Sequence, residues 1–209
     1  MNRTKGSCLV WFDTEYTSLD LEGARLVQVA LVVTDMEGRR VAAPDQDFVT
    51  AVRLPPESPV SDFLARECPA LVLQARAETA PTVDEVDRAL AARLDALCGP
   101  VASRIGDRPV LAGNSIHADW WLACRFLPVF LSRLHYRQLD VSSLKLLWLA
   151  SGFGPEFDKG NIAQIREYLP GWILPAEAQR HDALYDVMCS VAELNFYRKR
   201  FIRDQAARI

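Results

Sequence analysis

Two carboxylates stand two residues apart directly after the first apolar run of the chain. Asp13 and Glu15 follow residues 8–12, whose density of hydrophobic side chains indicates a buried central strand. In an extended chain, residues i and i+2 point to the same side, so both carboxylates would enter one small volume. Two such charges repel and raise each other's pKa unless a cation holds them. Because hard oxygen ligands suit Mg²⁺ or Mn²⁺, the pair is a candidate metal site.

The same spacing occurs twice more in the sequence. Asp20 and Glu22 lie in a polar segment, and Asp35 and Glu37 lead into Gly38. Gly and acidic residues in such an arrangement are typical of turns, so we expect both of these pairs to be solvated loop charges.

Further titratable residues near the ends of expected helices can complete the site. Asp119 falls in the first turn of an expected helix, a position where a carboxylate is also favoured by free backbone N–H groups alone. Asp186 lies beside the apolar residues Leu184 and Val187 of the last helix, and a carboxylate there needs a partner. His181 precedes it by five residues, and an imidazole with an ordinary pKa near ~6.5 can accept a proton from a water molecule. These residues together have the chemistry of a metal-dependent phosphodiester hydrolase.

The elements that position these residues follow from periodicity and turn signals. Three strands joined by short connections are expected at 7–13, 24–34 and 47–54, and two more at 109–112 and 138–141. Helices are expected at 82–97, at 117–134, from 141 through 148, and from 181 or 182 onward, the first opened by a Thr82–Glu85 capping box. Prolines break any long element between residues 55 and 81. The expected fold class is α/β, with a mixed β-sheet flanked by α-helices, an order similar to the ribonuclease H-like architecture.

Length, composition and charge limit the classes of function that this chain can have. A chain of 209 residues with 50% hydrophobic residues suits one domain, and a net charge of −3 argues against a wide basic face for long nucleic acid. The five cysteines are scattered without a Cys-x-x-Cys pair, so we expect reduced core thiols and a cytoplasmic protein. The first apolar run is too brief for a signal peptide or a membrane span, and no membrane partner is expected.

Four separate blocks of the sequence resemble the oligoribonucleases, which belong to the DEDDh family of 3′-to-5′ exonucleases. They occur in the family's order at 12–20 (FDTEYTSLD), 113–119 (GNSIHAD), 135–145 (HYRQLDVSSLK) and 181–186 (HDALYD). The segment 190–194 (SVAEL), leading to Tyr197 and Arg198, matches as well. Agreement in several blocks is far more specific than agreement in a single triplet.

The resemblance implies a single exonuclease domain over residues 1–209 that releases 5′-mononucleotides from short single-stranded RNA, dinucleotides among them. His181 would be the general base, and two divalent cations, Mg²⁺ or Mn²⁺, would be held by Asp13, Glu15, Asp119 and Asp186. Leu19 matches a residue that wedges between bases. The positions around the substrate's 5′-phosphate are matched by Ser115, Arg137, Ser142 and Ser143. Tyr136, with Arg137, would lie near the active site of a neighbouring subunit, which implies a homodimer.

Departures from the family pattern leave alternatives open. Ser18 replaces a usual Gly, Trp120 and Trp121 replace charged residues, and residues 55–81 lack the Trp and His that help to close the family's substrate pocket. This altered segment favours a DEDDh exonuclease that acts on longer single-stranded DNA or RNA, whereas the 135–137 block counts against it. A phosphodiesterase acting on free cyclic or linear dinucleotides is a second alternative. A non-catalytic nucleic-acid-binding module is disfavoured, because a buried acidic cluster that serves no metal is costly.

Overall fold

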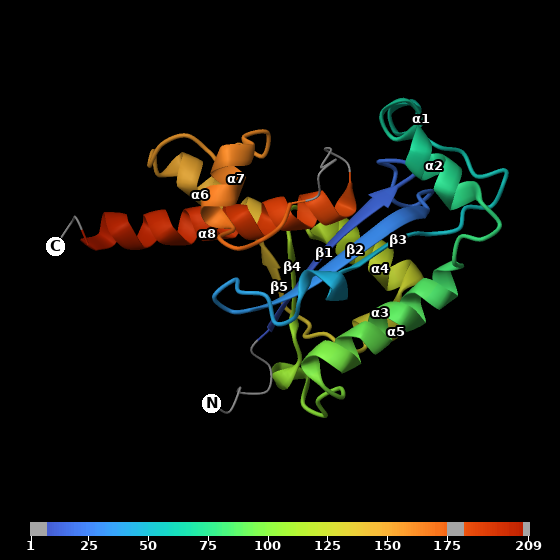
Figure 1. Ribbon diagram of the computed structural model, residues 1–209, viewed down its shortest axis with the longest axis horizontal. Coiled ribbons are helices and arrows are strands. Elements are labelled where there is room, and N and C mark those ends of the chain that lie inside the picture. Colours follow the sequence, from blue (N-terminus) through green and yellow to red (C-terminus); the bar gives the residue numbers. More distant parts are fainter. Residues whose placement is uncertain (1–7, 175–181, 207–209) are drawn as a thin grey trace.

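A mixed five-stranded sheet forms the centre of the computed structural model, which describes residues 8–174 and 182–206. The strand order is β3-β2-β1-β4-β5. β2 pairs antiparallel with β1 and β3, whereas β4 runs parallel to both β1 and β5. Their bounds are β1 Cys8–Tyr16, β2 Leu26–Asp35, β3 Phe48–Ala51, β4 Val110–Gly113 and β5 Gln138–Asp140. The predicted fold class is confirmed, and Figure 1 shows helices on both sides of the strands.

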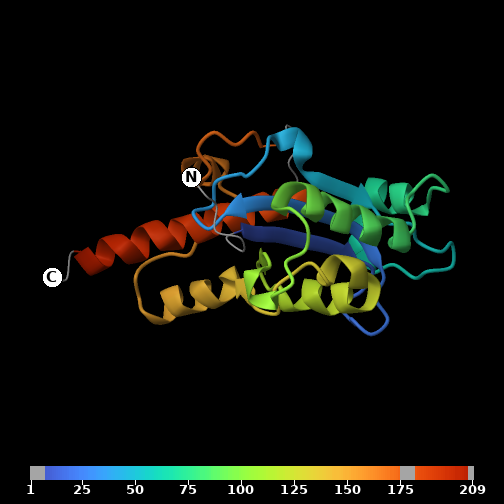
Figure 2. The same cartoon turned by 90° about the horizontal axis from the view of Figure 1, so that it is seen from below.

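Alternating side chains of β1 enter two hydrophobic cores on opposite faces of the sheet. Leu9 and Trp11 pack in the core that includes α8 (Ala183–Ala206), together with α6 (Val141–Ala150) and α7 (Ile162–Tyr168). Val10 and Phe12 pack in the core that includes α3 (Val83–Cys98), α4 (His117–Phe126) and α5 (Pro128–Leu131). Burial of both faces explains why the strand is almost continuously apolar up to Asp13. In Figures 1 and 2, the C-terminal end of α8 extends beyond the sheet.

Local signals in the sequence account for several helix starts. The predicted capping box is present, since Thr82 Oγ1 accepts from the backbone N–H of Glu85 and Glu85 Oε2 accepts from that of Thr82. Within the proline-rich segment, α1 (Asp62–Glu67) is capped by Ser61, and Pro69 occupies the first turn of α2 (Pro69–Arg76). Short 3₁₀ turns lie at Pro44–Gln46 and Ile105–Asp107. No helix within the described residues has both the length and the apolarity needed to cross a membrane.

The buried carboxylate of Asp87, on α3, holds the start of α5. It is 4% exposed and accepts hydrogen bonds from the backbone N–H groups of Val129 (2.9 Å) and Phe130 (2.7 Å). These two groups have no partner within the helix, because they lie in its first turn. The contact ties α3 to α5 on one face of the sheet.

Several boundaries and one burial prediction are corrected by the structure. The expected helix at 117–134 is wrong as a single element, because Leu127 leaves the helical conformation and Pro128 starts α5. The first strand continues through Tyr16, so the carboxylates lie within it and not after it. None of the five cysteines forms a disulfide in the described part of the chain. Cys189 is buried and Cys124 is exposed, with the other three in between, so the prediction of core thiols holds for one of them.

Candidate active site

Three carboxylates converge at the end of the central strand. One carboxylate oxygen from each of Asp13, Glu15 and Asp186 lies within 4.8 Å of the others. Asp13 pairs with Ala30 and Glu15 with Gln28 across β2, so the extended backbone that aims both acids to one side is fixed by a neighbouring strand. An oxygen-rich cluster of this size suits a hard divalent cation.

The first turn of α8 brings Asp186 to the strand. Asp182 caps the helix, with Oδ1 accepting from the backbone N–H groups of Leu184 and Tyr185 at 3.1 Å. The next residue, Ala183, donates its N–H to Gln28 Oε1 at 2.9 Å, and Gln28 is the strand partner of Glu15. This hydrogen bond therefore fixes the start of α8 against β1 and β2, next to the acids of β1. His181, the predicted general base, lies outside the described residues.

Asp119 approaches β1 from the opposite face of the sheet. Its Oδ1 accepts hydrogen bonds from Thr14 N at 2.9 Å and from Thr14 Oγ1 at 2.7 Å, and the residue is only 5% exposed. The turn into α4 passes so close to β1 that a Cβ on Gly113 would lie 2.9 Å from Phe12 O. This glycine permits the close approach, because real Cβ atoms essentially never come that near to a backbone atom. Asp119 is thus a buried neighbour of the strand acids and not a solvated helix start.

Burial raises the pKa values of Asp13, Glu15 and Asp119, and neighbouring carboxylates add to the rise. Burial raises the pKa of Asp13 well above its ordinary range, and the charges of Asp119, Asp186 and Glu15 add to the rise, while Lys159 opposes it. Burial is also the main cause that raises the pKa of Glu15 to about 8 and that of Asp119 to about 7, although the hydrogen bonds from Thr14 favour the ionised form of Asp119. A bound cation would stabilise the ionised forms of all of them.

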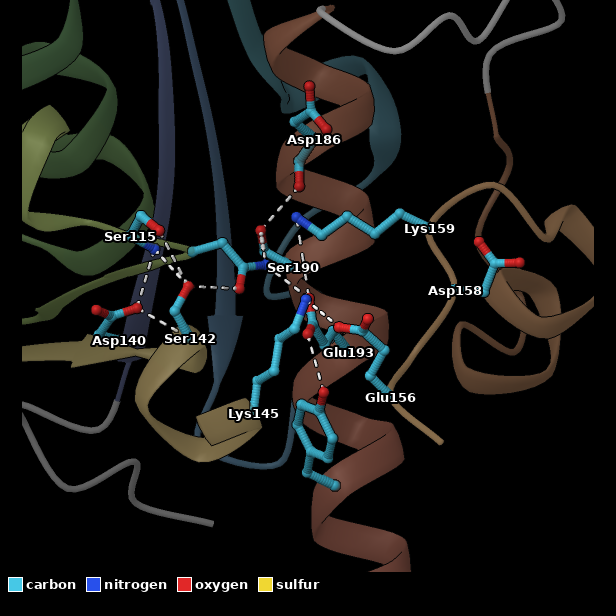
Figure 3. A network of polar contacts seen from close by, with 12 residues as sticks. Ser115, Asp140, Ser142, Lys145, Glu156, Asp158, Lys159, Asp186, Ser190 and Glu193 are labelled. Atoms are coloured by element: carbon cyan, nitrogen blue, oxygen red, sulfur yellow. Dashed lines mark hydrogen bonds and ion pairs between the residues drawn. The ribbon is translucent and has the colours of Figure 1, made fainter. Parts of the chain in front are cut away.

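Two of the predicted substrate-binding serines, Ser115 and Ser142, meet at the turn into α4 (Figure 3). Ser115 donates its backbone N–H to Asp140 Oδ1 at 3.0 Å and to Ser142 Oγ at 2.9 Å, and the two serine hydroxyls are 3.2 Å apart. Ser115 has a φ of 51°, so the turn between β4 and α4 is held in a conformation that non-glycine residues rarely adopt. Asp140 also caps α6 through the N–H of Ser142, while Ser143 is exposed on the same helix.

Leu19 lies in the loop between β1 and β2 and is 89% exposed. Hydrogen bonds between Thr17 and Arg25 close the loop, and the N–H of Ser61 donates to Thr17 O at 2.8 Å. The loop that carries Leu19 is therefore attached to the start of α1.

Tyr136 and Arg137 lie at the other end of the sheet. Val10 pairs with Leu111 and Leu111 with Gln138, all in parallel strands, so Tyr136 is about five residues behind Asp13 along the strand direction. That offset is roughly 16 Å at the usual rise per residue, before the lateral spacing of two strands is added. Tyr136 is 58% exposed and stacks on His135 with ring centroids 4.4 Å apart. The structure does not bring this pair to the carboxylates of the same chain.

Three residues near the site are not predicted as site residues from the sequence. Thr14 holds Asp119, and Asn114 and Glu193 link the serine pair to α8. Thr14 gives no signal beyond its place between two acids. Glu193 has a signal in retrospect, since an acidic residue stands inside an apolar stretch of α8 and is only 1% exposed.

Two cavities lie apart from these residues. One of about 540 Å³ is lined by Arg40, Trp172 and Asn195 among others, and one of about 360 Å³ by Val52 and Phe126 among others. Neither is lined by any of the four acids, so the convergence of the carboxylates, and not cavity size, identifies the site.

Comparison with known proteins agrees with this geometry. Residues 10–194 match the family model RNase T, described as exonuclease. The oligoribonuclease of Corynebacterium glutamicum is 32% identical over 92% of this chain and 79% of its own length, and that of Azoarcus sp. is 32% identical over 93% and 95%. Among solved structures, cell-death related nuclease 4 has a TM-score of 0.62 at 17% identity, covering 93% of this chain and 64% of that one. Exonuclease I of Escherichia coli with a dA16 oligonucleotide has a TM-score of 0.62 at 16% identity, covering 94% and 42%.

Proposed function

This chain belongs to the oligoribonucleases of the DEDDh exonuclease family and is a 3′-to-5′ exoribonuclease, and on that premise we propose that it hydrolyses short single-stranded RNA, dinucleotides in particular, to 5′-mononucleotides. The observation that carries the proposal is the convergence of Asp13, Glu15 and Asp186 within 4.8 Å in a chain with such relatives.

The acidic residues have the donor set for divalent cations. Asp13, Glu15 and Asp186 would bind Mg²⁺ or Mn²⁺ through their carboxylate oxygens, with Asp119 supplying a fourth carboxylate from the other face of the sheet. When bound, such ions stabilise the attacking and leaving oxygens at phosphorus. Thr14 orients Asp119, Asp182 and Gln28 fix the first turn of α8, and His181 would accept the proton of the attacking water.

Preference for short substrates follows from the serine pair. Ser115 and Ser142 lie at the carboxyl ends of β4 and β5, the same end of the sheet as the acids. We assign them to contacts with the terminal 5′-phosphate of a dinucleotide. Ser143 and, from a neighbouring subunit, Arg137 are further candidates for contacts with this phosphate, and Leu19 would pack against a base. A terminal phosphate offers charged oxygens that a continuing backbone lacks, so contacts of this kind favour a chain that ends there.

The assay compares a 5′-phosphorylated RNA dinucleotide, a long single-stranded RNA and the matching DNA, each with Mg²⁺, with Mn²⁺ and with excess chelator. We expect the dinucleotide to be cleaved fastest and chelator to abolish activity. Equal activity in chelator would refute metal dependence. Faster cleavage of the long strand would favour the alternative, an exonuclease for longer single strands, which the absence of Trp and His from residues 55–81 supports.

We also propose a homodimer in which Tyr136 and Arg137 serve the partner's site. Their distance from the acids of their own chain supports this assignment. The helix that follows them, α6, carries Leu146, Leu147 and Leu149 at 67%, 55% and 45% exposure, an apolar surface of the kind that a second copy covers. Mixing Asp119→Asn and Tyr136→Ala protomers should restore activity. No rescue after demonstrated subunit exchange would refute the sharing.

We propose a reducing compartment, the cytoplasm, because the five cysteines form no disulfide in the described part of the chain.

A further inference from the structure

The side-chain amide of Asn114 joins the serine pair to α8. Its Oδ1 accepts from Ser142 Oγ at 3.2 Å, and its Nδ2 donates to Ser190 Oγ and to Glu193 Oε2, each at 2.9 Å. Figure 3 shows the serines and the residues of α8 on the two sides of this bridge. An amide can make such a bridge because one end only accepts and the other only donates.

The partners on α8 allow one orientation of that amide. Ser190 uses its single hydroxyl proton on Asp186 O, at 2.9 Å, so its oxygen must accept from Asn114. Glu193 is 1% exposed, and two donors lie near its carboxylate: Tyr197 OH is 3.1 Å from Oε1 and Lys159 Nζ is 3.9 Å from Oε2. A carboxylate in this setting accepts from Asn114. Both partners therefore turn the amino group of Asn114 toward α8 and its carbonyl toward Ser142.

The orientation of Asn114 determines what the two serine hydroxyls can do. Ser142 gives its only proton to Asn114 Oδ1, and its oxygen accepts from Ser115 N. Ser115 Oγ lies 3.2 Å from Ser142 Oγ, so the Ser115 hydroxyl is the donor in this contact and can transfer its hydrogen bond to a substrate oxygen. If the amide were reversed, an N–H group would face Ser142, and the hydroxyl proton of Ser142 would lose its fixed acceptor.

We propose that Asn114, held by Glu193 and Ser190, is a positioning residue: it holds the Ser142 hydroxyl in place beside Ser115 and so leaves the Ser115 hydroxyl to donate to the terminal phosphate of the substrate. The inference rests on the proposed contact between these serines and that phosphate. Asn114 and Glu193 act through the serines and do not touch the substrate.

The test measures the ratio of KM for an RNA dinucleotide with a 5′-hydroxyl to KM for the same dinucleotide with a 5′-phosphate. Asn114→Ala and Glu193→Ala should each lower this ratio about tenfold, the equivalent of one charge-assisted hydrogen bond, with kcat changing much less than KM. Glu193→Gln should keep most of the ratio, because the Gln carbonyl can accept from Asn114 while its amide donates to the oxygen of Tyr197. Glu167→Ala, which removes an exposed glutamate 3.7 Å from Lys199, is the matched control and should leave the ratio unchanged.

The outcomes separate this inference from its premise. If Ser142→Ala lowers the ratio but Asn114→Ala and Glu193→Ala do not, the positioning role is refuted. An equal fall in kcat for both substrates, or no rescue by Glu193→Gln, indicates a merely structural role and also refutes it. Thermal unfolding of each variant identifies loss of folding, and Asn114→Ala, which deletes a less buried side chain, decides the question if Glu193→Ala does not fold. A wild-type enzyme with no preference for the 5′-phosphate would refute the phosphate contact itself, and with it this inference.

Discussion

Replacing Asp119 by Asn should stabilise the metal-free protein while it abolishes catalysis. Asp119 is 5% exposed, and burial raises its pKa from an ordinary 3.8 to about 7. Asn keeps the oxygen that accepts from Thr14 N and Thr14 Oγ1, so the contacts that hold the side chain in place are retained. What the substitution removes is a charge that the folded chain must bury beside other acids.

The size of the effect follows from the pKa. One pKa unit corresponds to about 1.4 kcal/mol, so the rise from 3.8 to about 7 costs the ionised folded state about 4 kcal/mol. Burial is the largest cause of this rise, and the charge of Asp119 in turn raises the pKa of nearby Asp13, so part of the cost is common to the two residues. We therefore expect Asp119→Asn to raise the free energy of unfolding by about 1 to 3 kcal/mol in chelator at pH 8.

The higher unfolding free energy of Asp119→Asn, relative to the wild type, should depend on pH. A carboxyl whose pKa is higher in the folded state than in the unfolded state binds more protons when folded, so its contribution to stability is present at acidic pH and is lost as pH rises toward 7. The difference between Asp119→Asn and the wild type should be full above pH 7, less than half as large at pH 5, and negligible below about pH 3.

Urea unfolding at pH 5 and pH 8, in chelator and in Mn²⁺, measures these differences. Saturating Mn²⁺ should reduce or cancel the variant's advantage, since the wild type gains about 2.7 kcal/mol from a cation at a hundred times its Kd and the variant gains less. A variant that is no more stable than the wild type in chelator at pH 8 would show that Asp119 carries no buried electrostatic cost.

Three further perturbations test other contacts. Thr14→Val deletes the hydroxyl that donates to Asp119, and should weaken Mn²⁺ binding several-fold in a titration followed by calorimetry, whereas unchanged affinity would contradict an orienting role. Asp87→Ala leaves the N–H groups of Val129 and Phe130 without their acceptor and should cost about 2 to 4 kcal/mol of unfolding free energy with kcat retained. Leu147→Glu places a charge on the apolar face of α6 and should shift the proposed dimer toward monomer in light scattering, and an unchanged dimer mass would place the interface elsewhere.

The sequence predicted the sheet well because its strands carry strong local signals. The spacing of Asp13 and Glu15 correctly predicted two carboxylates on one side of an extended strand, and the distance to Asp186 is consistent with a shared site. The capping box at Thr82 was equally readable, since every atom it needs lies within four residues.

What sequence reasoning missed depends on contacts between distant residues. Nothing local shows that Thr14 bonds to Asp119, 105 positions away. The helix α7 (Ile162–Tyr168) was not predicted, because its short apolar pattern becomes meaningful only when Ile165 and Tyr168 pack into the core with α8. The break at Pro128 was missed because apolar residues continue in phase on both sides of it, although proline itself favoured a new helix start.

Because the acids are brought together by elements from both cores, catalytic activity depends on complete folding of the chain. β1 is shared by both cores, α4 brings Asp119 through one of them, and α8 brings Asp186 through the other. A polypeptide in which only one layer has docked would hold an incomplete set of ligands. An intermediate emerging from the ribosome would thus be inert toward cellular RNA, and nuclease activity would switch on only with the last packing step.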